Sequence, residues 1–386
     1  MKHFPRPQLA SEMIEAILGK NLFGDNHNGL FLAAPRRTGK TTFLRLDLKP
    51  ALEQRGVEVV YVDLWSNLES DPGLIIAEAV GKALARHDSF MTKIAKSSGV
   101  DKISIPGVVS LGLGQVGQVN GITLTDALQT LIDTAKRPVA LIIDEAQHAL
   151  TSEHGQNTLL ALKSARDQIN QPGVVQLMLV MSGSDRDKLL HLVHGNSAPF
   201  FGSRVGHMPE LGAKFIAFIA QEIAAVRPDL TPVDTDSLLQ AFQLFGNRPQ
   251  LFMAAVSDAV SPLADVPERF EPLVRTEALA QRDRDEREME SAFLGLTPLG
   301  QAILWRMLDR EDHFRPYDAE ALDFYREKTG RAWSVAMIQK TLQALRDQKP
   351  SMIWKSAMGE YSVSDAAMHR WYRERVKLKT WPPTSG

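Results

Sequence analysis

The chain of 386 residues is longer than one hydrophobic core usually holds, so we expect two or three domains. It has no cysteine, which excludes disulfides, cysteine-ligated zinc and thiol catalysis, and its net charge of -2 excludes a uniformly basic nucleic-acid coat. The N-terminus lacks an apolar core of signal-peptide length, and no run of about 18 apolar residues follows, so we expect a cytoplasmic protein with no membrane partner.

Helix-period and strand-like segments alternate over roughly the first 210 residues, which predicts an α/β fold with a parallel sheet wrapped by helices. The expected strands are short, apolar and bounded by loop signals, as buried parallel strands are: residues 29–34, 57–64, 139–144, 174–182 and 205–211. Residues 103–122 contain five glycines, a density that predicts a mobile hairpin or loop. From Ala213 onward the pattern is helical, and the charged run 283–290 is expected on the solvated face of a connecting helix.

A candidate phosphate-binding loop follows the first expected strand and opens a helix, which is the context such a loop requires. Lys40 would reach the β and γ phosphates of ATP, and Thr41 would offer its hydroxyl to Mg²⁺. Ala34 stands where the motif G-x-x-x-x-G-K-[ST] has its first glycine, and a methyl group is tolerated there if φ is negative. The alternative is a chance Gly-Lys-Thr on a surface loop. The predicted nucleotide-binding residues are Pro35, Arg36, Arg37, Thr38, Gly39, Lys40, Thr41 and Thr42.

The helix that this loop opens contains Pro50, which predicts a kink or a stop there.

Two acids follow the third expected strand. A parallel sheet delivers Asp144 and Glu145 to its C-terminal edge, where ligands bind. Asp144 would order the Mg²⁺ shell, and Glu145 would polarise the attacking water as general base. The alternative is a strand that merely ends in solvated acids. After a phosphate loop, the pair predicts an ATPase that converts ATP and water to ADP and phosphate.

Four segments of the chain resemble the AAA+ and STAND-type P-loop ATPases, most closely the group called archaeal ATPases, which also occurs in bacteria. They are PRRTGKT at 35–41, LIIDEAQ at 141–147, MSGS at 181–184 and SAPFFGSR at 197–204. The resemblance covers nearly the whole chain, and its first two segments are the specific ones. It implies an ATPase core, a small helical lid and a C-terminal winged helix, which we expect at 1–212, 213–270 and 271–386.

The resemblance also implies roles for three further residues. Ser182 matches a polar sensor of the γ-phosphate or the attacking water, with a strand-end serine bonded to backbone as the alternative. Arg204 matches an arginine finger that acts on a neighbouring subunit of a homo-oligomer, and Arg248 matches the sensor arginine of the lid. For both, the alternative is an ordinary surface arginine. Residues 4–7 would line the adenine pocket or form a simple N-terminal arm.

Residues 297–375 are interpreted as a winged helix, with helices at 298–308, 318–328 and 334–348 and a hairpin at 352–355 and 360–363. The third helix has Val335, Ile338, Leu342 and Leu345 on one face, and Gln339, Lys340, Gln343 and Arg346 elsewhere, as a recognition helix would. After Gly330 the chain has ten basic and four acidic residues, which favours the phosphate backbone of double-stranded DNA as partner. The alternative is a protein-docking or structural role. Trp354, Trp371 and Tyr372 are expected in the core.

These features together predict an ATP-driven switch or motor whose winged helix passes the nucleotide state to DNA or to a protein partner. The alternative is a slow nucleotide-gated interaction module, as in defence or regulatory ATPases, without DNA binding. A third hypothesis is a transposition helper or loader that needs ATP for stable DNA binding.

Overall fold

The computed structural model describes residues 3–19, 28–67, 69–87, 123–194, 198–261, 269–310, 314–348, 351–355, 359 and 361–384. The chain divides into two compact units. The first consists of Pro5–Arg36 and Lys40–Met208, and the second of Pro209–Gly386 together with Met1–Phe4 and Arg37–Gly39. The glycine-rich hairpin expected at 103–122 lies outside the described residues.

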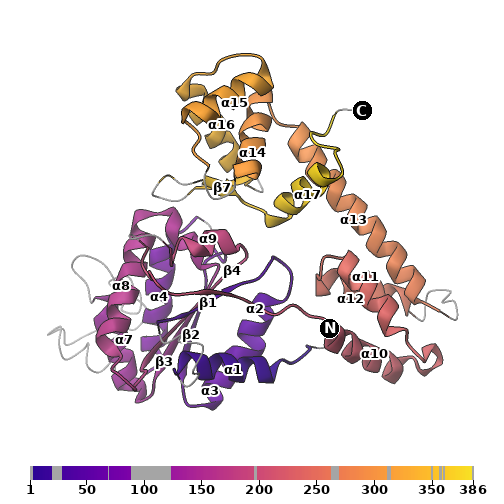
Figure 1. Ribbon diagram of the computed structural model, residues 1–386. Helices are drawn as coiled ribbons and strands as arrows, with labels where there is room; N and C mark the ends of the chain where they lie inside the picture. Colours follow the sequence, from indigo (N-terminus) through magenta and orange to yellow (C-terminus); the bar gives the residue numbers. More distant parts are fainter. Residues whose placement is uncertain are drawn as a thin grey trace, which may run out of the picture. The chain divides into compact units, whose positions relative to one another are not determined.

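The first unit contains a five-stranded sheet in the order β2-β3-β4-β1-β5, and all its paired strands are parallel (Figure 1). The predicted α/β fold with a parallel sheet is therefore confirmed. The strands are β1 (Leu30–Ala33), β2 (Glu58–Asp63), β3 (Val139–Asp144), β4 (Leu177–Gly183) and β5 (Val205–His207).

β1 and β2 are one residue shorter at each end than the sequence pattern predicts, and β4 and β5 each differ from it by three residues or more at one end. β4 begins at Leu177 because Val174 instead closes a tight turn with Gln171. β5 ends at His207, since the Met208 amide still donates to Ala33 but Pro209 has no N–H with which to continue the ladder.

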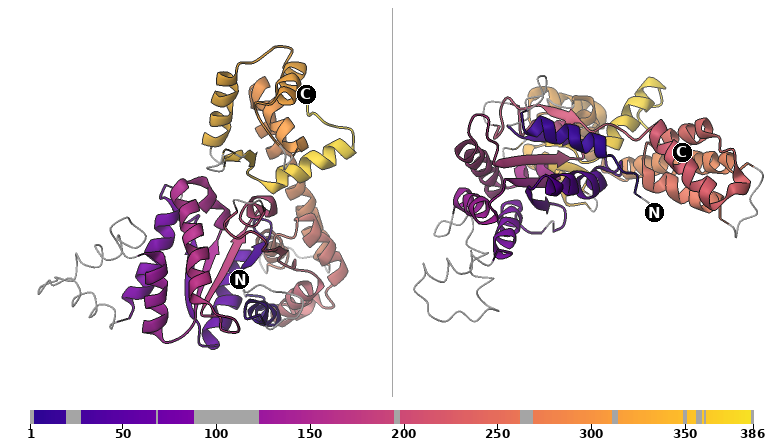
Figure 2. Two further views of the ribbon diagram at one scale, coloured as in Figure 1. Left: turned by 60° about the vertical axis from the view of Figure 1, so that its left-hand side comes forward. Right: turned by 90° about the horizontal axis from the view of Figure 1, so that it is seen from below.

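Helices cover both faces of the sheet (Figure 1 and Figure 2). Alternate strand residues such as Ala140 and Ile142 share one core cluster with residues of the helices that flank the phosphate loop. Those helices are α1 (Pro7–Ile17), α2 (Lys40–Phe43) and α3 (Lys49–Gln54). The described residues of this unit also form α4 (Pro72–Ala85), α7 (Leu124–Ala135), α8 (Glu153–Ile169), α9 (Arg186–Leu190) and the 3-10 helix η2 (Ala146–Thr151).

The helix after β1 does not stop at Pro50. It runs from α2 through a π turn, η1 (Leu44–Leu48), into α3 and ends at Gln54. In the π turn the Lys49 amide donates to the Leu44 carbonyl, five residues back. This widened turn stands directly before Pro50 and accommodates a residue that has no N–H to donate, which the sequence rule did not anticipate.

The second unit begins with a helical cluster, as the sequence predicts. It comprises α10 (Ala213–Val226), the 3-10 helix η3 (Pro228–Leu230), α11 (Thr235–Leu244), α12 (Pro249–Ala259) and the first half of α13 (Glu271–Leu294), which share one hydrophobic core. Phe4 packs on this core, with its ring centroid 5.7 Å from that of Phe215 and 5.4 Å from that of Phe218. The charged run 283–290 of α13 is mostly exposed, as predicted.

A second core forms around the C-terminal elements. These are α14 (Pro298–Arg310), α15 (Ala319–Thr329), α16 (Val335–Asp347) and an antiparallel pair, β6 (Ile353–Lys355) and β7 (Tyr361–Val363), so the predicted helices and hairpin are confirmed. Ile338, Leu342 and Leu345 of α16 are buried, but Val335 is 53% exposed because it is the first residue of the helix. The predicted apolar face is therefore one residue too long.

The sequence analysis missed one helix, α17 (Ala366–Lys377), which follows the hairpin. Its charged residues hide the apolar pattern, although Asp365 caps its first turn by accepting from the Ala367 amide. Trp371 and Tyr372 of this helix are buried together with Trp354, as expected for core residues.

None of the helices in the described part of the chain has the length and the apolar character needed to cross a membrane.

Replacing Ile142 with alanine should lower the free energy of unfolding by about 2 to 5 kcal/mol, because the fully buried side chain would leave a cavity in the centre of the sheet. Urea denaturation of the whole protein measures the change. Leu160→Ala, at a side chain that is 47% exposed on α8, is the control and should shift stability by no more than about 0.5 kcal/mol. Equal effects of the two substitutions would contradict the assigned core.

Candidate active site

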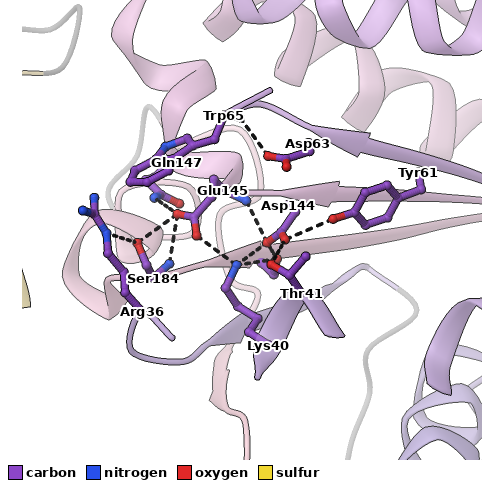
Figure 3. A network of polar contacts seen from close by, with 11 residues as sticks. Arg36, Lys40, Thr41, Tyr61, Asp63, Trp65, Asp144, Glu145, Gln147 and Ser184 are labelled. Carbon is purple, nitrogen blue, oxygen red and sulfur yellow. Dashed lines mark hydrogen bonds and ion pairs between the residues drawn. The ribbon is translucent and has the colours of Figure 1, made fainter. Parts of the chain in front are cut away.

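The strand order brings the predicted phosphate loop and the two acids to one edge of the sheet. β4 lies between β1 and β3, and because all three strands are parallel, their C-terminal ends meet there. The loop follows β1, Asp144 ends β3, and Ser182 of β4 pairs with Leu32 of β1. Segments more than 100 residues apart in the sequence thus build one polar cluster (Figure 3).

Lys40 is the centre of this cluster. Its side chain is 5% exposed, and its Nζ pairs with Asp144, lies 3.0 Å from Oε1 of Glu145 and donates to Ser182 Oγ at 3.4 Å (Figure 3). The structure therefore places three other predicted site residues, Asp144, Glu145 and Ser182, around the ammonium group of Lys40. The serine bonds to side chains here, not to backbone, which was the alternative interpretation of Ser182.

Asp144 accepts hydrogen bonds on both carboxylate oxygens. Thr41 Oγ1 donates to Oδ2 at 2.5 Å, the Tyr61 hydroxyl of β2 donates to the same oxygen at 3.2 Å, and Ser182 donates to Oδ1. Burial alone would raise the pKa of Asp144, but the charge of Lys40 and these hydroxyl donors hold it below its ordinary value. The carboxylate is therefore ionised at neutral pH.

The oxygen donors of Thr41 and Asp144 fit Mg²⁺, which usually takes one or two protein carboxylates and keeps several waters. No group of three or more metal-ligating side chains that could form a richer metal site exists among the described residues.

Glu145 has a left-handed backbone, with φ 56° and ψ 42°, a conformation that costs a residue other than glycine about 1 to 3 kcal/mol and tends to occur at functional sites. Its Oε2 accepts from Gln147 Nε2 at 2.6 Å and from Ser184, whose amide lies at 3.2 Å and whose Oγ lies at 2.9 Å. Burial would raise the pKa of Glu145, but Lys40 and Gln147 hold it below its ordinary value.

Sequence reasoning had no role for Gln147 and Ser184, which appeared only as letters of two motifs. Gly183, between Ser182 and Ser184, makes the arrangement possible, because a Cβ there would overlap Leu189 and the Gln147 amide. The close approach at Gly183 could have pointed to Gln147, but it is visible only in the structure and not in the sequence.

The phosphate loop has an anion-binding type of backbone. Arg37 and Gly39 have positive φ values, 65° and 94°, and such alternation turns successive N–H groups toward a common point. Ala34 is not among the residues with positive φ, so its methyl group is tolerated as expected. Of the remaining loop residues, Thr38 is buried, whereas the side chains of Pro35 and Thr42 are exposed.

Arg36 forms the outer edge of the cluster together with two residues that the sequence analysis missed. Its guanidinium lies 4.2 Å from the ring centroid of Trp65, and its Nε lies 3.5 Å from Ser184 Oγ (Figure 3). The ring of His148 packs edge-on against Trp65 at 5.5 Å. Burial lowers the pKa of His148 to about 4, opposed by the charge of Glu145, so the imidazole is neutral at physiological pH.

Two predicted arginines have other surroundings. Arg204 is exposed directly before the edge strand β5. Arg248 belongs to the helical unit, where its Nε donates to the Phe245 carbonyl at 2.6 Å and its guanidinium pairs with Asp285 of α13. The roles assigned to both arginines stay predictions.

Residues 25–190, which include the loop, both acids and Ser182, match the family described as the AAA domain. Among curated proteins, none matches the chain.

Two solved structures share the fold of the whole chain. One is a Walker-type ATPase of Pyrococcus abyssi, with 17% identity and a TM-score of 0.50 over 96% of each chain. The other is the ORC2 protein of Aeropyrum pernix in its ADP form, with 14% identity and a TM-score of 0.50 over 97% of this chain and 93% of that one. The parallel sheet of the predicted P-loop NTPase fold class is confirmed, and a C-terminal helical region follows it.

Acidification should destabilise the first unit through His148. The pKa of this residue falls from 6.5 to about 4 on folding, so the unfolded chain binds a proton first as the pH falls. Stability should be fully present above pH 6.5 and decline by up to about 1.4 kcal/mol per pH unit toward pH 4.

Urea denaturation at pH 7, 6 and 5 measures this slope, which His148→Gln should reduce and His207→Gln, at an exposed position, should not. If His148→Gln kept the wild-type slope, burial of a neutral imidazole would not be its cause.

Proposed function

We propose that this protein binds ATP with Mg²⁺ at the edge of its AAA domain and hydrolyses it to ADP and phosphate. The observation that supports this most directly is the convergence of one lysine, one threonine and two carboxylates from separate segments on one sheet edge. A relative with this fold, the ORC2 protein, was solved in an ADP form, which is consistent with a nucleotide at the same place.

The contacts of Lys40 indicate how the phosphates would bind. Its Nζ already has two anionic partners, and the β and γ phosphates would compete for it with these carboxylates. The loop residues would add backbone amides at the N-terminus of a helix. Thr41 and Asp144 would hold Mg²⁺, which neutralises phosphate charge when bound.

Glu145 would accept the proton of the attacking water, and Ser182, within reach of Lys40 and Asp144, would orient the γ-phosphate or that water. Gln147 and Ser184 donate hydrogen bonds to the second carboxylate oxygen of Glu145, and these bonds lower the basicity of the carboxylate. Because a weaker base removes the proton of water more slowly, these hydrogen bonds favour the second candidate function, a slow nucleotide-gated interaction module in which the bound state is the signal.

We further propose that residues 213–270 are a lid and that residues 297–375 are a winged helix that acts on double-stranded DNA or on a protein. In support, the polar side chains that α16 presents are exposed: Gln339, Lys340, Gln343 and Arg346. Arg204, exposed at a sheet edge, would serve as a finger toward a neighbouring copy of the chain. Arg248 would serve as the sensor of the lid, a role in which it exchanges Asp285 for phosphate.

Purified wild-type protein should release phosphate from Mg²⁺-ATP, and Lys40→Ala should abolish the release because the triphosphate loses its cation. Glu145→Gln should retain ATP binding but lower the rate about 10² to 10⁴-fold, as loss of a general base does. Lys49→Ala, a change of the same type at a partly exposed residue of α3, should leave the rate unchanged. Equal release by wild type and Lys40→Ala would refute the site.

Adding double-stranded DNA to the same assay separates the two candidate functions. A rate that DNA raises supports the DNA-coupled switch or motor. A slow rate that DNA does not change supports the nucleotide-gated module.

Ser184→Ala tests whether the hydrogen bond from the Ser184 hydroxyl lowers the basicity of Glu145. Loss of one hydrogen bond to a charged group is worth about 1.5 kcal/mol or more, so the pKa of Glu145 should rise and phosphate release should increase up to about tenfold if base strength limits the rate. The pH profile of the rate should shift toward higher pH with it. Ser164→Ala, at an exposed serine of α8, is the control. A lower rate in Ser184→Ala would mean that this serine aligns the base productively.

A further inference from the structure

A small pocket lies among the C-terminal elements of the second unit, between α16 and the β6–β7 hairpin. Its volume is about 190 Å³. Six of the residues that line it have polar, charged or aromatic side chains: Tyr317, Gln339, Gln343, Arg346, Lys355 and Tyr361. They come from three places in the sequence, since Tyr317 precedes α15, three residues belong to α16, and two belong to the hairpin.

The hairpin side of the pocket combines a cation with aromatic rings. Lys355 Nζ lies 5.4 Å from the ring centroid of Tyr361. The hydroxyl of Tyr361 is hydrogen-bonded to that of Tyr317, which ties the loop before α15 to β7. The two rings are therefore fixed relative to each other and to the lysine.

The helix side of the pocket offers amides and a second cation. Gln339, Gln343 and Arg346 follow one another at the spacing of a single helix face and are exposed. Asp347 accepts from Gln343 at 2.8 Å and lies 3.7 Å from Arg346 Nε. Asp347 does not line the pocket, and none of the described residues that do so is acidic. The pocket is therefore positive.

The volume of the pocket and its lining side chains together limit which kind of ligand it can bind. Sites for free small molecules usually measure about 300 to 1,000 Å³, so a volume of 190 Å³ suits a part of a larger molecule. Tyrosine rings stack on nucleobases, glutamine amides bond to base edges, and a lysine and an arginine neutralise phosphate. An acidic peptide would use the two cations but not the aromatic and amide groups.

We propose that this pocket binds one unpaired nucleotide of DNA. The inference rests on the proposed function, because it takes α16 and the hairpin as a DNA-binding surface, and it adds which DNA is preferred. A base inside a duplex would have to leave its stack to enter the pocket, at a cost of a few kcal/mol, whereas a base in a single-stranded overhang would not. The chain thus distinguishes DNA with an overhang from blunt DNA.

The test uses the full chain with Mg²⁺-ATP at one fixed salt concentration and two fluorescent probes, a blunt duplex and the same duplex with a short single-stranded overhang. Fluorescence anisotropy should show about tenfold tighter binding of the overhang probe, since one stacked base contributes about 1 to 3 kcal/mol. Lys355→Gln and Gln339→Ala should each reduce this preference several-fold.

Lys340→Gln is the matched control, because it removes the same charge from an exposed position of α16 that does not line the pocket. It should weaken binding of both probes to the same extent and keep the preference. Thermal unfolding of each variant verifies that the C-terminal core is intact, and Gln339→Ala leaves every charge in place.

The outcomes separate this inference from the proposed function. Equal binding of both probes by wild type, or an unchanged preference in both pocket variants, overturns the inference and leaves a DNA-coupled ATPase in place. Binding of neither probe overturns the inference and the DNA part of the proposed function together.

Discussion

The buried pairing of Lys40 with Asp144 and Glu145 is the interaction on which the rest of the site depends. Removing one partner from a buried ion pair leaves an uncompensated charge and costs about 3 to 5 kcal/mol. The lysine begins a helix directly after β1, and both acids stand at the end of β3, so their pairing requires β1 and β3 on either side of β4. Ser182 of β4, Thr41 and Tyr61 donate to the carboxylate of Asp144, which helps to keep it ionised although it is buried. The same charges that stabilise the edge of the sheet are those that the proposed phosphate and Mg²⁺ site would use.

Helix α13 connects the helical cluster to the C-terminal elements. Val274 and Ala278 in its first half belong to the core of the helical cluster, whereas Phe293 near its end belongs to the core of the C-terminal elements. Between them Asp285 pairs with Arg248, and Glu290 lies 3.0 Å from Arg375 of α17. The helix therefore packs on both cores of the second unit.

The sequence predicted the sheet and the central residues because their signals are local. Apolar runs mark the strands, and a Gly-Lys-Thr after the first strand and two acids after the third mark the candidate site. What it missed depends on contacts between distant segments. Gln147 and Ser184 matter only because the fold places them on Glu145, and Trp65 matters only because Arg36 stacks on it. The helix does not stop at Pro50 because a π turn, which no simple periodicity shows, precedes it. Helix α17 was missed because its many charges mask the residues that it buries.

The central claim is that the charge cluster around Lys40 is a binding site for the triphosphate of ATP. Isothermal titration of the whole protein with Mg²⁺-ATP tests it most directly, on wild type and on Lys40→Met, with circular dichroism showing that the variant is folded. The account predicts saturable binding to wild type, and affinity reduced at least tenfold in the variant, because loss of a charge-assisted hydrogen bond to phosphate is worth about 1.5 to 3 kcal/mol. Equal affinity of a folded Lys40→Met protein would contradict it.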